Sequence, residues 1–197
     1  MTPRSELGHP AHTAPGGFEV LDLTGPPESR PEVTSRFTIG RYDERRPGMY
    51  TTDLFEEGRC VHMGIDLGGP AGTPVHAFAS GEVIHAGYNP APGDYGHVLV
   101  LEHALEGRVL YALYGHLSAA TLGLSSVGRK VQAGDVLGWL GGLHENGGWP
   151  PHLHFQLAKQ RPETHDLPGV VTQEERAAAL EAYPDPREVL GPLYEDD

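Results

Sequence analysis

The sequence predicts a mainly β fold with one short helix near the C-terminus, and three observations support this fold class. Between residues 60 and 158, short apolar runs alternate with Gly, Pro and Asp turns, as in all-β domains. The 197-residue chain contains 27 glycines and 18 prolines, which favour turns over long helices. The clearest helical stretch is residues 172–182. This length allows one domain with a sizeable core, plus extensions.

The N-terminal region is expected to be irregular. Residues 1–35 are rich in Pro, Gly and charge and contain one short apolar run, so we expect an arm that packs on the domain at one or two points. The polar run at 41–48 indicates an ordered loop within residues 36–54. Residues 1–54 are therefore predicted to be an arm and loops that pack on a β-domain of residues 55–160.

Six strands are expected within the β-domain, because each is a short apolar or alternating run that ends at a turn former. The predicted strands are 74–79, 81–86, 97–103, 109–116, 135–140 and 152–157.

The C-terminal extension, residues 161–197, is predicted to contain a short helix at 172–182. Thr172 and Glu175 have the spacing of a capping box, and the residues that follow are rich in alanine. Pro184 stops the helix.

The strand at 152–157 places two histidines on one face. Side chains two residues apart share a face of a strand, so His152, His154 and Gln156 point one way and the apolar residues between them point into a core. A lone His-x-His pair is most often a polar outer face. The pattern suits a cleft only when further polar residues meet it.

Such partners stand upstream in the run 62–66. His62, Asp66 and His154 together offer two imidazoles and one carboxylate, the three-ligand shell of a catalytic zinc site whose fourth position is open to water. His152 and His116 remain as candidate proton-transfer groups.

The strand at 109–116 follows the same two-residue rule. Leu110, Ala112, Tyr114 and His116 are expected to share one face, with His116 at the end of the strand. The one cysteine, Cys60, excludes an intrachain disulfide and is interpreted as a buried, inert thiol. His103 is expected to be structural.

Several short motifs occur in a fixed order over about half of the chain. They are HMGID at 62–66, GTPV at 72–75, SGEVI at 80–84, YGHVLV at 95–100, YGHLS at 114–118, VGRKVQAGDVLG at 127–138 and PHLHF at 151–155. In this order they resemble the lysostaphin-type (LytM-like) zinc metalloendopeptidases, which cut peptide cross-links of bacterial peptidoglycan.

The resemblance implies a fold, a cofactor and roles. The fold would be an antiparallel β-sheet core of the duplicated hybrid motif, or barrel-sandwich, type with a central groove. One Zn²⁺ per chain would be held by His62, Asp66 and His154, with His116 and His152 as the catalytic pair. Either histidine could be the general base; we favour His152 in that role, with His116 as oxyanion stabiliser. The implied substrate is a peptide derived from peptidoglycan.

This chain departs from the family pattern near the last motif. Trp149 and Pro150 stand where Ser/Thr-Gly is usual, Gln156 replaces a common Glu, and His97 replaces a common Asn. The expected consequence is an altered groove wall and substrate preference. Trp149 could pack on a substrate peptide or cover the core.

An alternative function is a latent or non-catalytic zinc-binding module with a regulatory or peptide-binding role. It requires a fourth ligand from Asn89, Asn146 or the arm.

Charge and hydrophobicity restrict which binding partners and which cellular location are expected. The formal net charge of −13 makes nucleic acid an unfavourable partner, because phosphate binding needs a basic surface. No stretch approaches the ~20 apolar residues of a membrane span. The first ten residues lack an apolar signal region, so the default expectation is a cytoplasmic location, with the cell envelope open if another route exports the protein.

Overall fold

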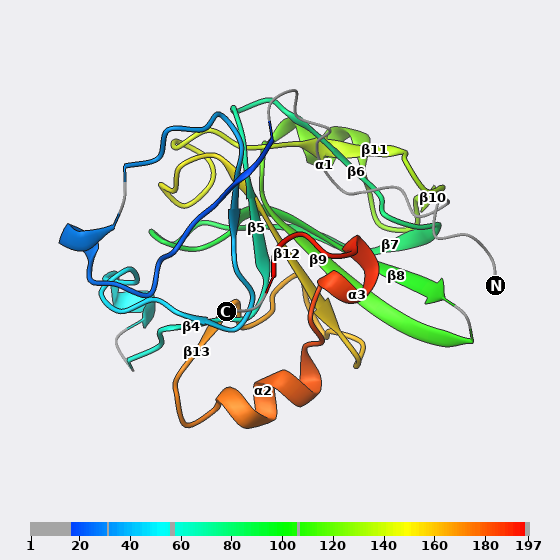
Figure 1. Ribbon diagram of the computed structural model, residues 1–197. Coiled ribbons are helices and arrows are strands. Elements are labelled where there is room, and N and C mark those ends of the chain that lie inside the picture. The colour runs from blue at the N-terminus through cyan, green and yellow to red at the C-terminus, as the bar shows by residue number, and fades with distance from the viewer. Residues whose placement is uncertain (1–16, 31, 56–57, 106, 196–197) are drawn as a thin grey trace.

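An eight-stranded sheet organises the chain and confirms the mainly β prediction (Figure 1). The computed structural model describes residues 17–30, 32–55, 58–105 and 107–195. All neighbouring strands of this sheet run antiparallel except the first two, which are parallel. In spatial order they are β1 (Glu19–Val20), β2 (Thr38–Gly40), β5 (Ile65–Gly68), β12 (His152–Ala158), β9 (Arg108–Leu117), β8 (Gly96–Leu105), β7 (Gly81–Asn89) and β10 (Lys130–Val131).

Two smaller sheets and several short helices complete the described fold. The two-stranded sheet pairs β11 (Val136–Trp139) with β6 (Pro74–His76), and the three-stranded sheet has the order β13 (Val170–Val171), β4 (Val61–His62), β3 (Glu44–Arg45). The helices are η2 (Pro27–Ser29), η3 (Asp53–Phe55), α1 (Ala120–Leu124), α2 (Arg176–Ala182) and α3 (Arg187–Leu190). Within the described residues, every helix is too short or too polar to cross a membrane.

All six predicted strands are present, although the one predicted at 74–79 ends at His76. The prediction of a loop over residues 36–54 was wrong. This stretch contains β2, β3 and η3. The strand β2 is only three residues long, too short for alternation to be visible in the sequence. Its Ile39 is 1% exposed, and its backbone pairs with β5, so tertiary pairing creates the strand. Residues 1–16 of the predicted arm lie outside the described residues.

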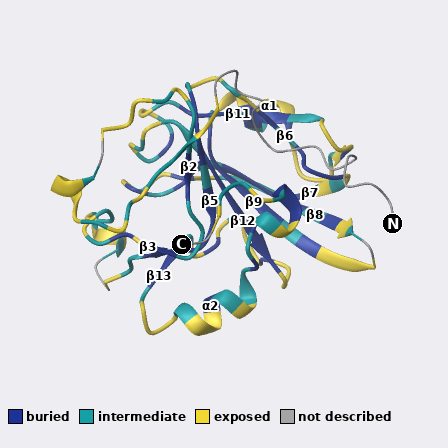
Figure 2. Ribbon diagram, viewed as in Figure 1, coloured by how far each residue is buried: buried dark blue, intermediate teal, exposed yellow. Residues whose placement is uncertain are grey.

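The core lies between the main sheet and the smaller β6–β11 sheet, and the central strands are the most buried part of the ribbon (Figure 2). Phe155 on β12 is fully buried and contacts the rings of Tyr114 and Phe78, with ring centroids 5.1 and 5.7 Å away. Truncating such a residue to alanine costs about 3–5 kcal/mol. This packing fixes the apolar face of β12 and therefore the direction of its polar face.

The predicted capping box is confirmed at the start of the C-terminal helix. The Thr172 backbone N–H donates to Glu175 Oε2 at 2.9 Å, and the Glu175 N–H donates to Thr172 Oγ1 at 3.2 Å. Regular α-helix begins only at Arg176, because residues 173–175 form the turn that these bonds close. The helix ends at Ala182, shortly before Pro184.

His103 on β8 is an internal histidine that we expect to make folding pH-dependent. Its side chain is fully buried against Phe78, and its Nδ1–H donates to the Ser80 carbonyl at 3.1 Å. Burial lowers the pKa of His103 to about 4. Between about pH 6.5 and pH 4, His103 is protonated in the unfolded chain but neutral in the folded chain. The free energy of unfolding therefore decreases as the pH falls through this range.

The expected result is a fall of about 2 kcal/mol in the free energy of unfolding between pH 7.5 and 5 from this one group. Urea unfolding at both pH values measures it. His103→Phe should lack this component, whereas His144→Phe, at a side chain that is 84% exposed, should retain it. An equal pH dependence in wild type and His103→Phe would contradict the assignment.

Candidate metal centre and substrate groove

Three elements bring the predicted ligands together. Asp66 on β5 and His154 on β12 are direct partners in the antiparallel pair, so their side chains share one face. His62 ends β4, four residues before Asp66. Gly64, between them, permits close approach of this turn to β12, because a Cβ there would lie 2.6 Å from His154 Cε1.

The three candidate ligand atoms form a nearly equilateral triangle. His62 Nε2 lies 3.0 Å from His154 Nδ1, and each of these nitrogens lies 3.1 Å from Asp66 Oδ1. Ligands about 2.0–2.1 Å from one zinc ion lie roughly 3.3 Å apart at tetrahedral angles. Only small shifts would therefore accommodate the ion.

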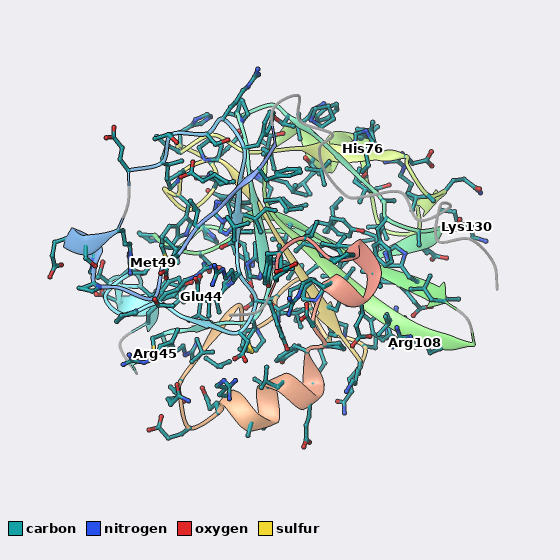
Figure 3. All side chains as sticks on the ribbon, viewed as in Figure 1. Glu44, Arg45, Met49, His76, Arg108 and Lys130 are labelled. Atoms are coloured by element: carbon teal, nitrogen blue, oxygen red, sulfur yellow. The ribbon has the colours of Figure 1, made fainter. Side chains whose placement is uncertain are left out.

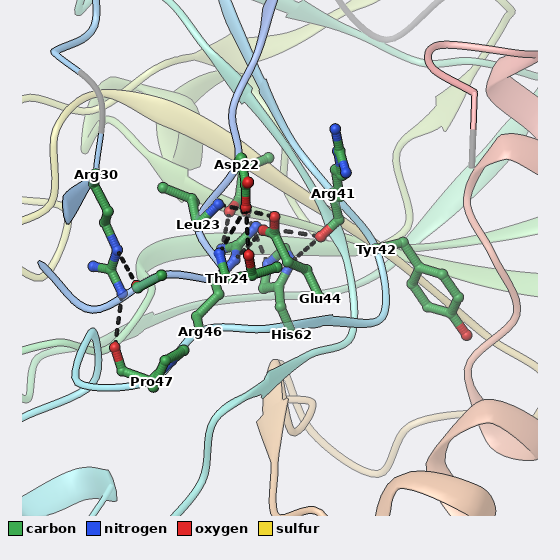
Figure 4. Close-up of polar contacts among 12 residues, drawn as sticks. Asp22, Leu23, Thr24, Arg30, Arg41, Tyr42, Glu44, Arg46, Pro47 and His62 are labelled. Atoms are coloured by element: carbon green, nitrogen blue, oxygen red, sulfur yellow. Dashed lines mark hydrogen bonds and ion pairs between the residues drawn. The ribbon is translucent and has the colours of Figure 1, made fainter. Parts of the chain in front are cut away.

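In the rings of His62 and His154, the nitrogen that points away from Asp66 donates a hydrogen bond, which leaves a lone pair on the nitrogen that points towards Asp66. His62 Nδ1–H donates to the Arg41 carbonyl at 2.9 Å (Figure 4), and His154 Nε2–H donates to Gln156 Oε1 at 3.0 Å. Each neutral imidazole has one N–H, so His62 Nε2 and His154 Nδ1 carry no proton. Two imidazole lone pairs and a carboxylate oxygen thus converge. This arrangement is repulsive unless a cation lies among them, so the residues fit a metal ion.

Gln156 has a different place from the one predicted. We expected it to alter the groove wall, but its side chain is fully buried and its Nε2 donates to the Pro168 carbonyl at 3.4 Å. The amide orientation leaves Oε1 facing His154. Gln156 therefore sets the tautomer of His154, which a partner of this kind commonly does for a metal-binding histidine.

Arg46 is the residue of the site that the sequence interpretation missed. It is 2% exposed, and its Nη1 donates to Asp66 Oδ2 at 2.7 Å while its Nε donates to Glu44 Oε2 at 2.8 Å. The Leu23 backbone N–H donates to the other Glu44 oxygen at 3.0 Å (Figure 4). The run 41–48 contains several charged residues, and nothing in their spacing singles out Arg46.

Arg46 contributes to the charge state of Asp66. Burial alone would raise the pKa of Asp66, but the neighbouring His62 and Arg46 side chains outweigh it and hold this pKa well below its usual range. Burial and the Arg46 charge lower the pKa of His62 to about 4. At neutral pH the site therefore has an ionised carboxylate and a neutral imidazole, the forms that bind a metal.

His116 and His152 lie beside each other at this site. Their ring centroids are 4.4 Å apart, and His152 Nε2 lies 3.7 Å from Asp66 Oδ1. His116 Nδ1–H donates to the Asn146 carbonyl at 3.1 Å, and His152 Nδ1–H donates to the Pro150 carbonyl at 2.7 Å. Both rings thus keep an Nε2 lone pair, and burial lowers the pKa of each below its usual value.

The prediction that His116 shares a face with Tyr114 was wrong. Tyr114 packs in the core against Phe155, whereas the His116 ring meets His152 on the opposite side. The pairing of β8 with β9 shifts register here by one extra residue on β9, and His116 has a φ of 63°. A β-bulge of this kind turns the side chain out of strict alternation. Left-handed backbone at a non-glycine residue is strained, which is typical of functional positions.

A groove of about 710 Å³ contains the ligand set and both further histidines in its lining. Neither Asn89 nor Asn146 lines it, and the Asn146 side chain is engaged by Gly141, Gly148 and Trp149. The latent-module alternative also allowed a fourth ligand from the arm. Among the described residues, the arm brings the Arg46 guanidinium to Asp66, and a guanidinium has no lone pair with which to bind a metal.

Of the two alternatives left open for Trp149, the structure agrees with a place in the groove, whereas the prediction of a buried Cys60 was wrong. The Trp149 ring lines the groove, and its Nε1–H donates to the Gly93 carbonyl at 2.9 Å, so its position is fixed. Cys60 is half-buried rather than buried. It packs beside a small cluster that includes Val61 and Met63, and it is not part of the candidate metal group.

Comparisons with known proteins agree with the geometry. The model of peptidase family M23 matches residues 60–166, more than half of the chain. DD-carboxypeptidase/endopeptidase Mpg of Neisseria meningitidis is 38% identical over 96 residues, which cover 49% of this chain and 20% of that protein. Murein hydrolase activator EnvC of Escherichia coli is 33% identical over 112 residues, which cover 57% and 24%.

Among solved structures, the catalytic domain of the antimicrobial peptidase lysostaphin from Staphylococcus simulans aligns with 30% identity and a TM-score of 0.43. The alignment covers 52% of this chain and 71% of that chain. The match to Mpg spans a fifth of that protein's length, and the match to EnvC about a quarter.

Proposed function

The chain belongs to peptidase family M23, as the lysostaphin-type motifs indicated, and on that premise we propose that it is a zinc-dependent endopeptidase. Its proposed substrates are peptides of the peptidoglycan cross-link type. The observation that carries the proposal is the convergence of two imidazole lone pairs and a carboxylate oxygen, 3.0–3.1 Å apart, at one groove.

In this proposal His62, Asp66 and His154 hold one Zn²⁺ per chain. The ion would supply Lewis-acid activation of water and of the scissile carbonyl. Arg46 keeps the Asp66 carboxylate ionised and oriented, because it occupies Oδ2 and leaves Oδ1 facing the two histidines. Gln156 and the Arg41 carbonyl hold the two rings in the required tautomers.

The second pair of histidines would move protons. His152 has an unprotonated Nε2 and a side chain that is 17% exposed, so it can accept the proton of the attacking water and pass it to the leaving amine. After its Nε2 takes up a proton from solvent, His116 would donate that N–H to the negatively charged oxygen formed from the scissile carbonyl. Negative charge developing there offsets the cost that burial imposes on protonating His116.

Metal content tests the ligand assignment directly. Elemental analysis of the purified full chain should give close to one zinc per protein, and His154→Ala should lose it. His116→Ala should keep it, because His116 is assigned to proton transfer. The exposed His144→Ala serves as a matched control for histidine removal. Folding of each variant is checked by circular dichroism. A His154→Ala protein that is folded and still holds stoichiometric zinc would refute the site.

Activity is tested on cross-linked muropeptides with the full chain, by release of new amino groups before and after chelation. The expected result is cleavage that chelation abolishes and added zinc restores. Zinc at one equivalent with no cleavage of any peptide would refute the endopeptidase proposal and favour the non-catalytic binding module.

A further inference from the structure

Six apolar side chains line the groove, and we name this set of residues the arm wall. The arm wall consists of Leu21, Leu23, Met49, Leu54, Phe55 and Trp149, all of which line the same groove as the candidate metal ligands. In Figure 3, Met49 and Glu44 are labelled on the side of the molecule opposite Arg108 and Lys130. Five of the six residues precede residue 60, outside the stretch that the family model matches.

The two aromatic residues of the arm wall, Phe55 and Trp149, are held in place because both pack on the ring of Tyr50. The Tyr50 ring lies 5.0 Å from Phe55 and 5.9 Å from Trp149, measured between centroids. The Trp149 indole is held by its bond to the Gly93 carbonyl. Gly93 packs closely under this cluster, since a Cβ there would lie 3.1 Å from Phe55 Cε2. A preformed apolar surface binds a side chain with little ordering cost.

Tyr50 connects the arm wall to the candidate metal centre. The hydroxyl of Tyr50, which packs on Phe55 and Trp149, accepts from Arg46 Nη1 at 3.2 Å, and the same Nη1 donates to Asp66 at 2.7 Å. The cluster of Tyr50, Phe55 and Trp149 is therefore close enough to the candidate metal site to contact substrate residues next to the cleaved bond. None of the six wall residues carries a charge, and Leu54 is 39% exposed although it is apolar.

We propose that the arm wall is a specificity pocket for a large apolar or aromatic side chain next to the scissile bond. This inference rests on the proposed peptidase activity but goes beyond the cross-link peptides, whose residues are small or charged. It names a different substrate class: peptides with a leucine- or phenylalanine-sized side chain within two residues of the cleaved bond. A glycine at that position buries nothing against the wall, whereas a large side chain removes apolar surface from water on both partners.

The test uses the zinc-loaded full chain and a mixed peptide library, with cleavage positions mapped by mass spectrometry. Matched peptides then differ only by Gly, Leu or Phe beside the mapped bond. We expect kcat/KM to be about 10- to 100-fold higher for the Leu and Phe peptides. Trp149→Ala and Leu54→Ala should each reduce this ratio at unchanged zinc content. Leu124→Ala is the matched control, because Leu124 is also 39% exposed and lies outside the groove.

Binding separates this inference from the proposed function. Isothermal calorimetry of the zinc-free protein should show tighter binding of the Phe peptide than of the Gly peptide, and Trp149→Ala should remove the difference. Cleavage with equal kcat/KM for Gly and Phe peptides overturns the specificity pocket and leaves the peptidase intact. Apolar-selective binding without cleavage of any peptide overturns the peptidase and leaves the pocket. Preference unchanged in both wall variants also overturns the pocket.

Discussion

Replacing Arg46 by methionine is expected to lower the free energy of unfolding by about 3–5 kcal/mol, because removing one partner leaves buried charges uncompensated. Arg46 donates to Asp66 and Glu44, and Glu44 is only 5% exposed. The variant should also bind zinc roughly 10- to 100-fold more weakly, as is usual when a partner that orients a metal ligand is lost.

Urea unfolding of the zinc-free protein measures the first effect, and competition with a zinc-binding dye measures the second. Arg45→Met is the matched control, because Arg45 is the exposed neighbour on β3. Arg46→Lys should lie between wild type and Arg46→Met, since lysine keeps the charge but not the planar fork. An Arg46→Met protein within about 1 kcal/mol of wild type would show that Asp66 and Glu44 need no buried cation.

Replacing His152 by alanine is expected to lower kcat roughly 100- to 10,000-fold at unchanged zinc content, the range for loss of a general base. The reason is geometric: His152 Nε2 is unprotonated and lies 3.7 Å from the Asp66 oxygen that faces the proposed ion. No ligand atom of the triangle belongs to His152, so metal binding should survive.

Steady-state kinetics on the muropeptide found to be cleaved, together with elemental analysis, measures both quantities. His144→Ala should leave kcat unchanged, because its side chain is 84% exposed on a loop. Full activity in His152→Ala would show that another group, and not His152, accepts the proton. Loss of zinc from a folded His152→Ala protein would instead make His152 part of the metal shell.

The extent to which the fold could be predicted depended on strand length. The strand β12 was predictable because six of its residues, 152–157, display a strict alternation whose apolar side is fully buried. Strands β1 to β3 have two or three residues each and were not predicted. Such segments become strands only because a neighbouring backbone pairs with them, and no local pattern encodes that neighbour.

The candidate ligands were nameable from the sequence because zinc chemistry demands particular residue types, and those types stand in ordered motifs at 62–66 and 151–155. Residue type alone did not reveal Arg46. Its partner Asp66 is 20 residues away, and a guanidinium has no fixed spacing from the carboxylate that it orients. The position of His116 was also misjudged, because a bulge breaks the alternation that placed it.

Local sequence thus suffices for the β character, the main strands and the chemical identity of the candidate metal ligands, because these follow from periodicity and from the donor atoms of each residue type. The tertiary structure alone settles the tautomers of His62 and His154, the contact of Arg46 with Asp66 and the apolar wall beside them. Each of these depends on distances between segments far apart in the chain, which are set only when the sheets pack.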